Sequence, residues 1–146
     1  MTETLSLLEA TALAQHLKVS RWTYPLVNAG HILGIALLIG AVVPMDLRIL
    51  RGINVARTVA LLRPFAVAGL LLAMTCGLML FIVQPVDYAA SPWFRAKLVL
   101  LALAIGNAVL HPRIADHPLS RQRVAVVLSL ALWPSVLIAG RMIAYG

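Results

Sequence analysis

Hydrophobic positions along the chain form four long runs, separated by short polar segments. The runs cover about residues 24–45, 64–84, 93–111 and 124–145. Each has close to the ~20 residues that an α-helix needs to cross the ~30 Å hydrocarbon layer of a bilayer. The pattern predicts an all-α fold, a four-helix transmembrane bundle whose short loops give an up-down-up-down order.

The segment before the first run has a different pattern. In residues 4–18, leucine and alanine recur at helical spacing, but charged and polar residues lie among them. Such a segment is too polar to span a membrane and is typical of an amphipathic helix lying in the membrane interface. Trp22 and Tyr24 follow it, as expected for interfacial aromatic residues. The sequence as a whole predicts one integral membrane domain over residues 1–146.

Charge is scarce in this chain and gathers at the ends of the runs. Of its 146 residues, 12% are charged and 62% are hydrophobic, and the formal net charge is +7. Soluble domains carry about 25% charged residues. Basic residues at span ends set membrane topology and contact lipid headgroups. We therefore expect the lipid bilayer, and not nucleic acid, as the partner of these residues.

Lysine and arginine are divided unequally between the two ends of the predicted bundle. The segments after the first and third runs carry seven of them: Arg48, Arg51, Arg57, Arg63, Arg113, Arg121 and Arg123. The opposite end carries five: Lys18, Arg21, Arg95, Lys97 and Arg141. Because cytoplasmic loops are enriched in basic residues, this bias places both termini outside and both basic loops in the cytoplasm.

Small residues recur at a spacing of four in the runs. The first run has Gly30 and Gly34, and the second has Gly69, Ala73 and Gly77. Lipid tails are as apolar as leucine, so membrane helices associate by close approach at small residues. We expect these glycines to have a structural role in helix–helix interfaces. The alternative is chance spacing in a chain rich in glycine and alanine.

Several polar residues are predicted to lie at a similar depth. A helix rises 1.5 Å per residue, so His31 lies roughly 10 Å inside the outer face of the first span. Asn28 is one turn above His31, and the alternating spans bring residues of the other three helices to the same half. The sequence predicts a polar pocket in the outer half of the bundle, formed by Asn28, His31, Met79, Lys97, Ser135 and Arg141.

His31 is the first candidate for chemistry, because ionisable residues inside a span are costly and are often functional. Three interpretations are open. His31 is a neutral histidine hydrogen-bonded within the bundle, a ligand of haem iron or copper, or a titrating group in proton movement. Met79 is a candidate thioether ligand, although methionine in a span is usually a core residue.

Charged residues at the span ends provide two further predictions. Arg141 and Lys97 are candidates to bind an anionic group such as a haem propionate or a lipid phosphate. The alternative for Arg141 is snorkelling to the headgroups. We predict a solvated ion-pair cluster that fixes the helix ends, formed by Asp46, Arg48 and Arg51. The sequence contains no nucleophile–base set and no phosphate-binding loop, so we do not expect an enzyme acting on its own.

Local motifs in three of the runs have a familiar form. They are Trp22-x-Tyr24-Pro25, His31-x-x-Gly34 and Asp46-Leu47-Arg48 in the first run, Phe94-Arg95-x-Lys97 in the third, and Gly140-Arg141-x-Ile143-Ala144-Tyr145 in the fourth. Together these motifs resemble an uncharacterised family of small bacterial four-span inner-membrane proteins. That family is distantly similar to copper-resistance protein D and to cytochrome b561-type bundles.

The resemblance implies a bacterial inner-membrane protein with periplasmic termini, in which His31 binds haem b or copper for electron transfer or copper handling. Other membrane or periplasmic redox proteins would then be its partners. The chain lacks the paired histidines at matching depth that a two-haem cytochrome has. One alternative is a non-catalytic structural or assembly subunit of a membrane complex, and a homo-oligomer is a further possible partner state. The other is a small-solute or proton carrier, which unbroken spans without a repeat make less expected.

Overall fold

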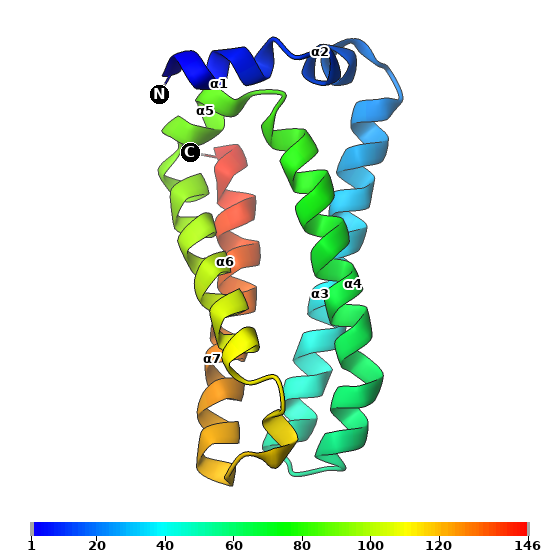
Figure 1. Cartoon of the computed structure of the whole chain (residues 1–146), viewed down its shortest axis with the longest axis vertical. Coiled ribbons are helices and arrows are strands. Elements are labelled where there is room, and N and C mark those ends of the chain that lie inside the picture. The colour runs from blue at the N-terminus through cyan, green and yellow to red at the C-terminus, as the bar shows by residue number, and fades with distance from the viewer. Residues whose placement is uncertain (1, 146) are drawn as a thin grey trace.

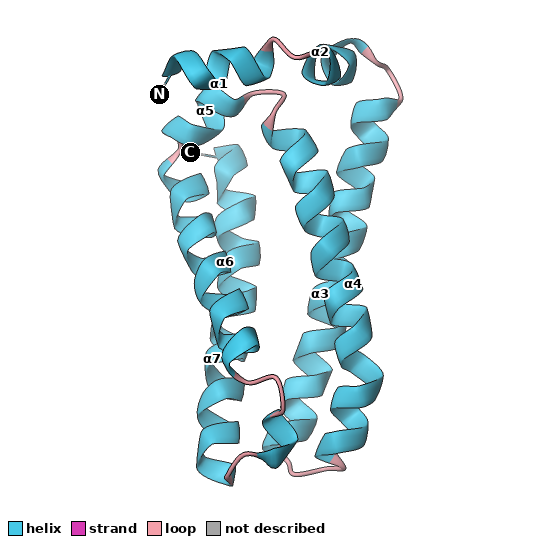
Figure 2. Cartoon of the chain, viewed as in Figure 1, coloured by secondary structure: helices cyan, strands magenta, loops and turns pink. Residues whose placement is uncertain are grey.

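The structure is a computed structural model that describes residues 2–145 (Figure 1). Within these residues it has no strand, and its elements are helical throughout (Figure 2). The helices are α1 (Thr2–Glu9), α2 (Ala12–Val19), α3 (Thr23–Leu50), α4 (Val55–Phe81), α5 (Pro85–Ala90), α6 (Pro92–Leu110), η1 (Ile114–Asp116), α7 (Leu119–Met142) and η2 (Ile143–Tyr145). The prediction of an all-α bundle is confirmed.

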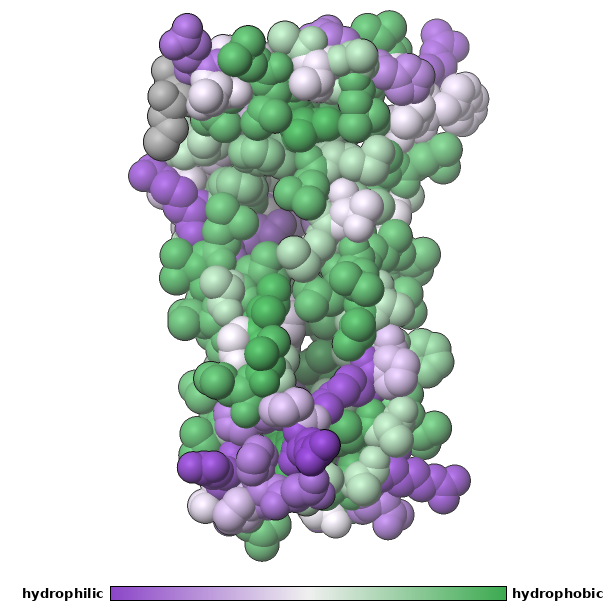
Figure 3. Space-filling view, in the orientation of Figure 1, coloured by the Kyte–Doolittle hydropathy of each residue, from purple (hydrophilic) through white to green (hydrophobic). Residues whose placement is uncertain are grey.

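Four of these segments are long and apolar enough to cross a membrane: α3, α4, α6, and α7 continued by η2. They run alternately down and up in Figure 1, so both ends of the described chain lie at the end that we call upper. Figure 3 shows a wide apolar band between polar residues gathered at the two ends. These features are those of a multi-pass membrane protein.

The four long helices form two hairpins that are joined along one edge. α3 packs along α4, α6 packs along α7, and the contact between α3 and α7 joins the two pairs. α4 and α6 meet at most at isolated points, so the bundle is loosely closed on that side. Because α4 and α6 do not pack along each other, cavities between the two hairpins are expected on the side where these helices face each other.

Glycines set the close approach of α3 and α4. A Cβ atom added at Gly34 would lie 2.5 Å from the backbone nitrogen of Ala73, and one added at Gly69 would lie 2.6 Å from that of Leu38. Real Cβ atoms essentially never come so close to backbone. The two backbones pack directly on each other here, which is how membrane helices gain van der Waals contact without a hydrophobic driving force.

A small apolar core joins the two hairpins halfway along the bundle. It consists of Leu38, Ala41, Val42, Ala66, Ala104 and Trp133, which come from all four long helices. Trp133 of α7 is the largest of these side chains and is 5% exposed. The core separates the upper part of the space between the hairpins from the lower part.

Two helices extend beyond the hydrophobic runs that predicted them. α3 continues to Leu50 instead of ending near residue 45, and α4 begins at Val55 instead of near residue 64. Gly52 and Asn54 end and restart the helices, because both have positive φ, at 66° and 41°. Pro64 lies inside α4 and does not begin it. The hydrophobic run measures the apolar part of a helix, whereas backbone conformation fixes its ends.

The prediction of one helix over residues 4–18 is wrong, because the segment forms α1 and α2. Thr11 separates them: its hydroxyl donates to the Leu8 carbonyl at 2.7 Å and accepts from the Ala14 amide at 3.4 Å. An ion pair between Lys18 and Glu9 bridges the two helices. Both lie across the upper end of the bundle, and α1 packs on α5 (Figure 1). Their position in a membrane interface stays a prediction.

Candidate functional site

A cavity of about 470 Å³ lies between the hairpins at the upper end, and we call it the upper cavity. Its volume is within the ~300–1,000 Å³ range of small-molecule sites. Its walls come from α3, α4, α5, α6, α7 and η2. The polar residues that line it are Asn28, His31, Gln84, Asp87, Tyr88, Ser91 and Lys97.

The imidazole of His31 is held in one orientation by α4. Its Nδ1 lies 2.7 Å from the carbonyl oxygen of Ala73. A carbonyl only accepts hydrogen bonds, so Nδ1 carries the proton and donates, and the neutral ring keeps a lone pair on Nε2. Gly77 leaves room for the ring, because a Cβ there would lie 3.0 Å from His31 Cε1. Gly77, which was predicted to have a structural role in helix packing, thus also makes room for the ring of His31, the candidate metal ligand.

Gly30 lies one residue before this histidine, on the same side of the α3–α4 contact. A Cβ added at Gly30 would lie 3.0 Å from the sulfur of Cys76. The cysteine is half-buried and free. Small residues at Gly30 and Gly77 therefore keep the upper part of the two helices close enough for His31 to reach the α4 backbone.

Lys97 brings a positive charge into the same cavity. Its ammonium group has no hydrogen bond or ion pair with any residue that the structure describes, and Asp87, which also lines the cavity, is not paired with it. A Cβ at Gly140 would lie 3.5 Å from Lys97 Nζ, so the side chain crosses α7 at a glycine. The cation is thus available to an anionic group that enters the upper cavity.

Three aromatic rings border the cavity at the junction of α4, α5 and α6. Phe81 and Phe94 stack with ring centroids 5.3 Å apart, and Tyr88 lies 6.3 Å and 5.6 Å from them. Burial raises the pKa of Tyr88, and the nearby Tyr24 adds to this effect. The phenol therefore stays protonated at neutral pH and is able to donate a hydrogen bond.

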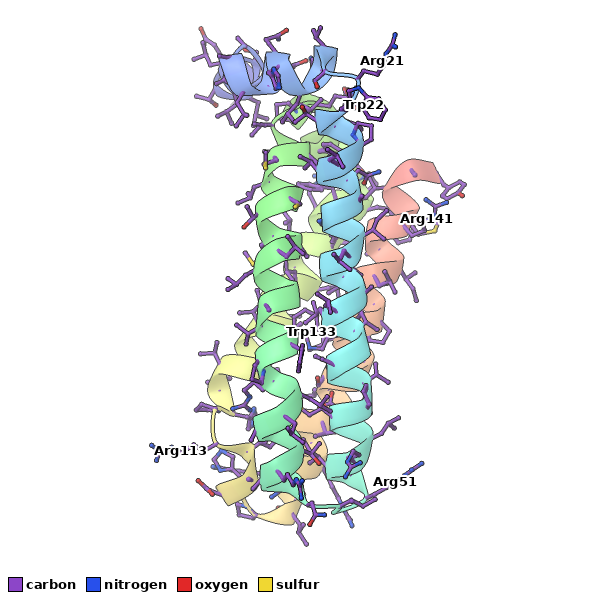
Figure 4. All side chains as sticks on the ribbon, turned by 90° about the vertical axis from the view of Figure 1, so that its right-hand side faces the viewer. Arg21, Trp22, Arg51, Arg113, Trp133 and Arg141 are labelled. Carbon is purple, nitrogen blue, oxygen red and sulfur yellow. The ribbon has the colours of Figure 1, made fainter. Side chains whose placement is uncertain are left out.

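The structure does not bring all the predicted pocket residues together. Arg141 is exposed and points away from the bundle (Figure 4), where it donates to the Tyr145 hydroxyl at 3.0 Å. Its guanidinium carbon lies 5.2 Å from the centroid of the same ring. Met79 and Ser135 do not line the upper cavity, and the Ser135 hydroxyl donates to the Ala131 carbonyl at 2.8 Å. The prediction rested on the depth of each residue, and depth does not say which side of its helix a residue faces.

The cavity residues that follow α4 were not predicted from the sequence. Gln84 ended the second predicted run, and Asp87, Tyr88 and Ser91 lay in the connection to the third. The structure forms the short helix α5 within this connection. Pro85 at the first turn of that helix was an available signal, because proline favours this position. A six-residue helix has too few positions for a hydrophobic period to reveal it.

A second cavity, of about 330 Å³, lies in the lower half, and we call it the lower cavity. Its lining is mainly apolar, with Asp46, Arg63, Asn107, His111 and Ser129 as its hydrophilic members. The Asn107 amide donates to the Ala125 carbonyl at 2.9 Å, which ties α6 to α7 beside the cavity.

The predicted ion-pair cluster of Asp46, Arg48 and Arg51 is wrong. Asp46 is 3% exposed and forms no ion pair with either arginine. Arg48 is exposed, and its Nε donates to the Thr58 hydroxyl at 3.1 Å. α3 continues past Asp46, so residues two positions apart face nearly opposite sides of the helix. Asp46 faces the bundle interior for this reason, and the Ser129 hydroxyl lies beside its carboxyl group.

Haem and copper place different demands on the side chains of the upper cavity. Within residues 2–145, no three His, Cys, Asp or Glu side chains gather closely enough to hold a metal ion. His31 is the imidazole of the upper cavity, and Met79 does not join it. One imidazole is sufficient as an axial haem ligand, because the porphyrin supplies the other nitrogens. A copper site made only of side chains needs more donors than this cavity offers.

No family model matches the chain, and no curated protein or solved structure matches it significantly.

Proposed function

We propose that this chain is a bacterial inner-membrane protein that binds haem b in its upper cavity and takes part in electron transfer. The observation that carries the proposal is the hydrogen bond from His31 Nδ1 to the Ala73 carbonyl, which leaves the Nε2 lone pair on a cavity-lining ring. Histidine ligands of metals characteristically donate their other ring N–H to a carbonyl or carboxylate, which fixes the tautomer.

Two other features of the upper cavity fit the same ligand. The unpaired ammonium of Lys97 is suited to a propionate carboxylate, and the apolar side chains of Leu80, Phe81 and Ile143 offer walls for a flat apolar ring system. Bound haem b would supply reversible one-electron transfer. The chain's own residues would fix its orientation and shield it from water. Membrane or periplasmic redox proteins would be the partners.

The proposed orientation places the upper end at the periplasm. The lower end carries the larger share of arginine, with Arg51 and Arg113 extending outward there (Figure 4). Because basic residues are retained on the cytoplasmic side, this distribution supports periplasmic termini. The upper cavity would then lie in the periplasmic half of the membrane, within reach of periplasmic electron donors.

Absorbance spectroscopy tests the haem proposal. The protein is expressed with ample haem, purified in detergent, and measured oxidised and then reduced with dithionite. We expect a Soret band that shifts on reduction, is absent from His31→Ala, and is retained in the matched control His111→Ala. A flat spectrum from the wild type, or an unchanged band in His31→Ala, would contradict the proposal.

A structural subunit is the second candidate function, and the outer face of α3 favours it. Ala36 and Gly40 are exposed at four-residue spacing, and a Cβ at Gly40 would meet no atom within 4 Å. Small residues that face lipid offer a close-packing surface for another helix. Disulfide crosslinking of Gly40→Cys in a Cys76→Ser background tests a homo-oligomer. Recovery of monomer alone in native membranes would argue against it.

A further inference from the structure

The lower cavity contains a carboxylate that is only partly satisfied. Asp46 is 3% exposed, and its Oδ2 has no hydrogen-bond partner among the residues that the structure describes. The Ser129 hydroxyl of α7 lies beside the carboxyl group, and both residues line the cavity. A buried acceptor without a partner is costly, so a polar group that enters the cavity and pairs with it gains free energy. The terminal torsion of aspartate is broad, so either oxygen is able to face the cavity.

The nearby cation does not neutralise this carboxylate. Arg63 also lines the lower cavity, but it forms no ion pair with Asp46. Its two terminal nitrogens donate to the carbonyl oxygens of Pro112 and His111, at the end of α6. Arg63 is thus used to hold the connection between α6 and η1 against α4, and the charge of Asp46 is left for another partner.

The walls of the cavity indicate what kind of cation fits. Apolar side chains such as Ile49, Leu70 and Val126 make up most of the lining, and the indole of Trp133 also lines it. Hard metal cations prefer sites with several oxygen ligands, which this cavity lacks. An organic ammonium group suits it better, because the carboxylate offers a counter-charge, the indole face attracts cations, and the apolar wall accepts a hydrocarbon body.

The cavity also has a route of access for such a compound. Exposed Val67 of α4 and exposed Val109 of α6 both belong to its lining. They lie on the two helices that do not pack along each other. In Figure 3 the face between the hairpins is hollowed in its lower half. An amphipathic amine dissolved in the bilayer therefore reaches the cavity from the side, with its hydrocarbon part in an apolar surrounding throughout.

We propose that the lower cavity is a binding site for an organic ammonium compound with an apolar body. Asp46 is the counter-ion, Ser129 orients its carboxylate, and Trp133 contacts the cation. The site shares no lining residue with the upper cavity, so it is independent of the proposed haem function.

Calorimetric titration of the purified protein in detergent tests the proposal with hexylamine as the probe, at about pH 8, where an alkylamine is still protonated. 1-Hexanol, which has a similar length and no charge, is titrated in parallel. We expect hexylamine to bind at least about tenfold more tightly than hexanol, the ratio that one charge-assisted hydrogen bond provides. Equal binding of the two probes, or no binding of hexylamine, would overturn the proposal without any variant being needed.

Two variants locate the binding. Asp46→Asn, which keeps the size of the side chain, is expected to remove the preference for hexylamine over hexanol. The matched control is Asp87→Asn, which removes a carboxylate from the upper cavity and is expected to keep the preference. If Asp46→Asn retains the full preference, the amine binds elsewhere and the proposal fails. Should Asp46→Asn not fold, Ser129→Ala is measured instead, with a reduced preference expected and an unchanged one counting against the site.

Discussion

The upper and lower cavities use the same helix in different ways. α3 supplies His31 to the upper cavity and Asp46 to the lower one, roughly 22 Å apart along the helix axis. The Nδ1 of His31 is satisfied by a carbonyl of the neighbouring helix, whereas Asp46 keeps an oxygen without a partner in the described structure. Each cavity is lined by one acidic and one basic side chain, Asp87 and Lys97 in the upper one and Asp46 and Arg63 in the lower one. The cavities differ in the group that is buried without a full set of partners, which is the Oδ2 of Asp46 in the lower cavity.

The difference follows from what lies beside each residue. At His31, glycines bring α3 and α4 so close that a backbone carbonyl is within reach of the ring. At Asp46, the Ser129 hydroxyl of α7 lies beside the carboxyl group, and the Oδ2 atom has no partner among the described residues. The close backbone contact of α3 and α4 thus lets a carbonyl satisfy the Nδ1 of His31, whereas no backbone group satisfies the Oδ2 of Asp46 in the described structure.

The largest expected effect comes from a change that removes both cavities together. Gly34→Leu places a side chain where a Cβ alone lies 2.5 Å from the Ala73 backbone. α3 and α4 must then separate, so we expect loss of the folded monomer. Size-exclusion chromatography and thermal unfolding in detergent measure this. Gly106→Leu is the control, because a Cβ there meets no atom within 4 Å, and normal folding of both variants would contradict the packing described.

A reciprocal pair of substitutions separates the two cavities. His31→Ala is expected to abolish the haem spectrum and to leave hexylamine binding within about twofold of wild type. Asp46→Asn is expected to do the reverse, since substitutions that share no partners act independently. The two readouts are absorbance after reduction and calorimetric titration. If either substitution removes both activities in a folded protein, the cavities are not separate sites.

Lys97→Met is expected to have an intermediate effect, confined to the upper cavity. The substitution removes the charge but keeps an apolar chain of similar length beside Gly140. Loss of one charge-assisted hydrogen bond weakens the proposed haem binding by about tenfold. Titration of haem into apoprotein measures it, with Arg95→Met as the matched change in an exposed cation of α6. Equal haem affinities for the two variants would show that Lys97 does not contribute to haem binding.

The smallest effect is expected at Arg141, despite its place in the motif Gly140-Arg141. Its guanidinium contacts Tyr145 outside both cavities, and exposed interactions of this kind contribute little. Arg141→Ala is expected to change haem and hexylamine binding by less than about twofold. A tenfold loss of haem in the same titration would show that Arg141 turns inward when the ligand is present.

The sequence predicted the helical elements well and their ends less well. Four hydrophobic runs were enough to identify α3, α4, α6 and α7, because a bilayer requires about 20 apolar residues in each span. They did not reveal that α4 begins at Val55, before its two arginines and Pro64. They also did not reveal the break at Thr11, because one capping hydroxyl is a local event that a hydrophobic period does not record.

For the candidate site, the sequence by itself determined depth. The spacing of His31 and Lys97 from their span ends placed both in the same half of the bundle, because the rise of a helix is constant. The tertiary structure alone decided which way each side chain faces. Successive residues turn by about 100° around a helix, so Gly140 faces Lys97 and Arg141 points outward. Asp46 became a buried carboxylate with an unpartnered oxygen for the same reason, since it faces the interior of the packed bundle.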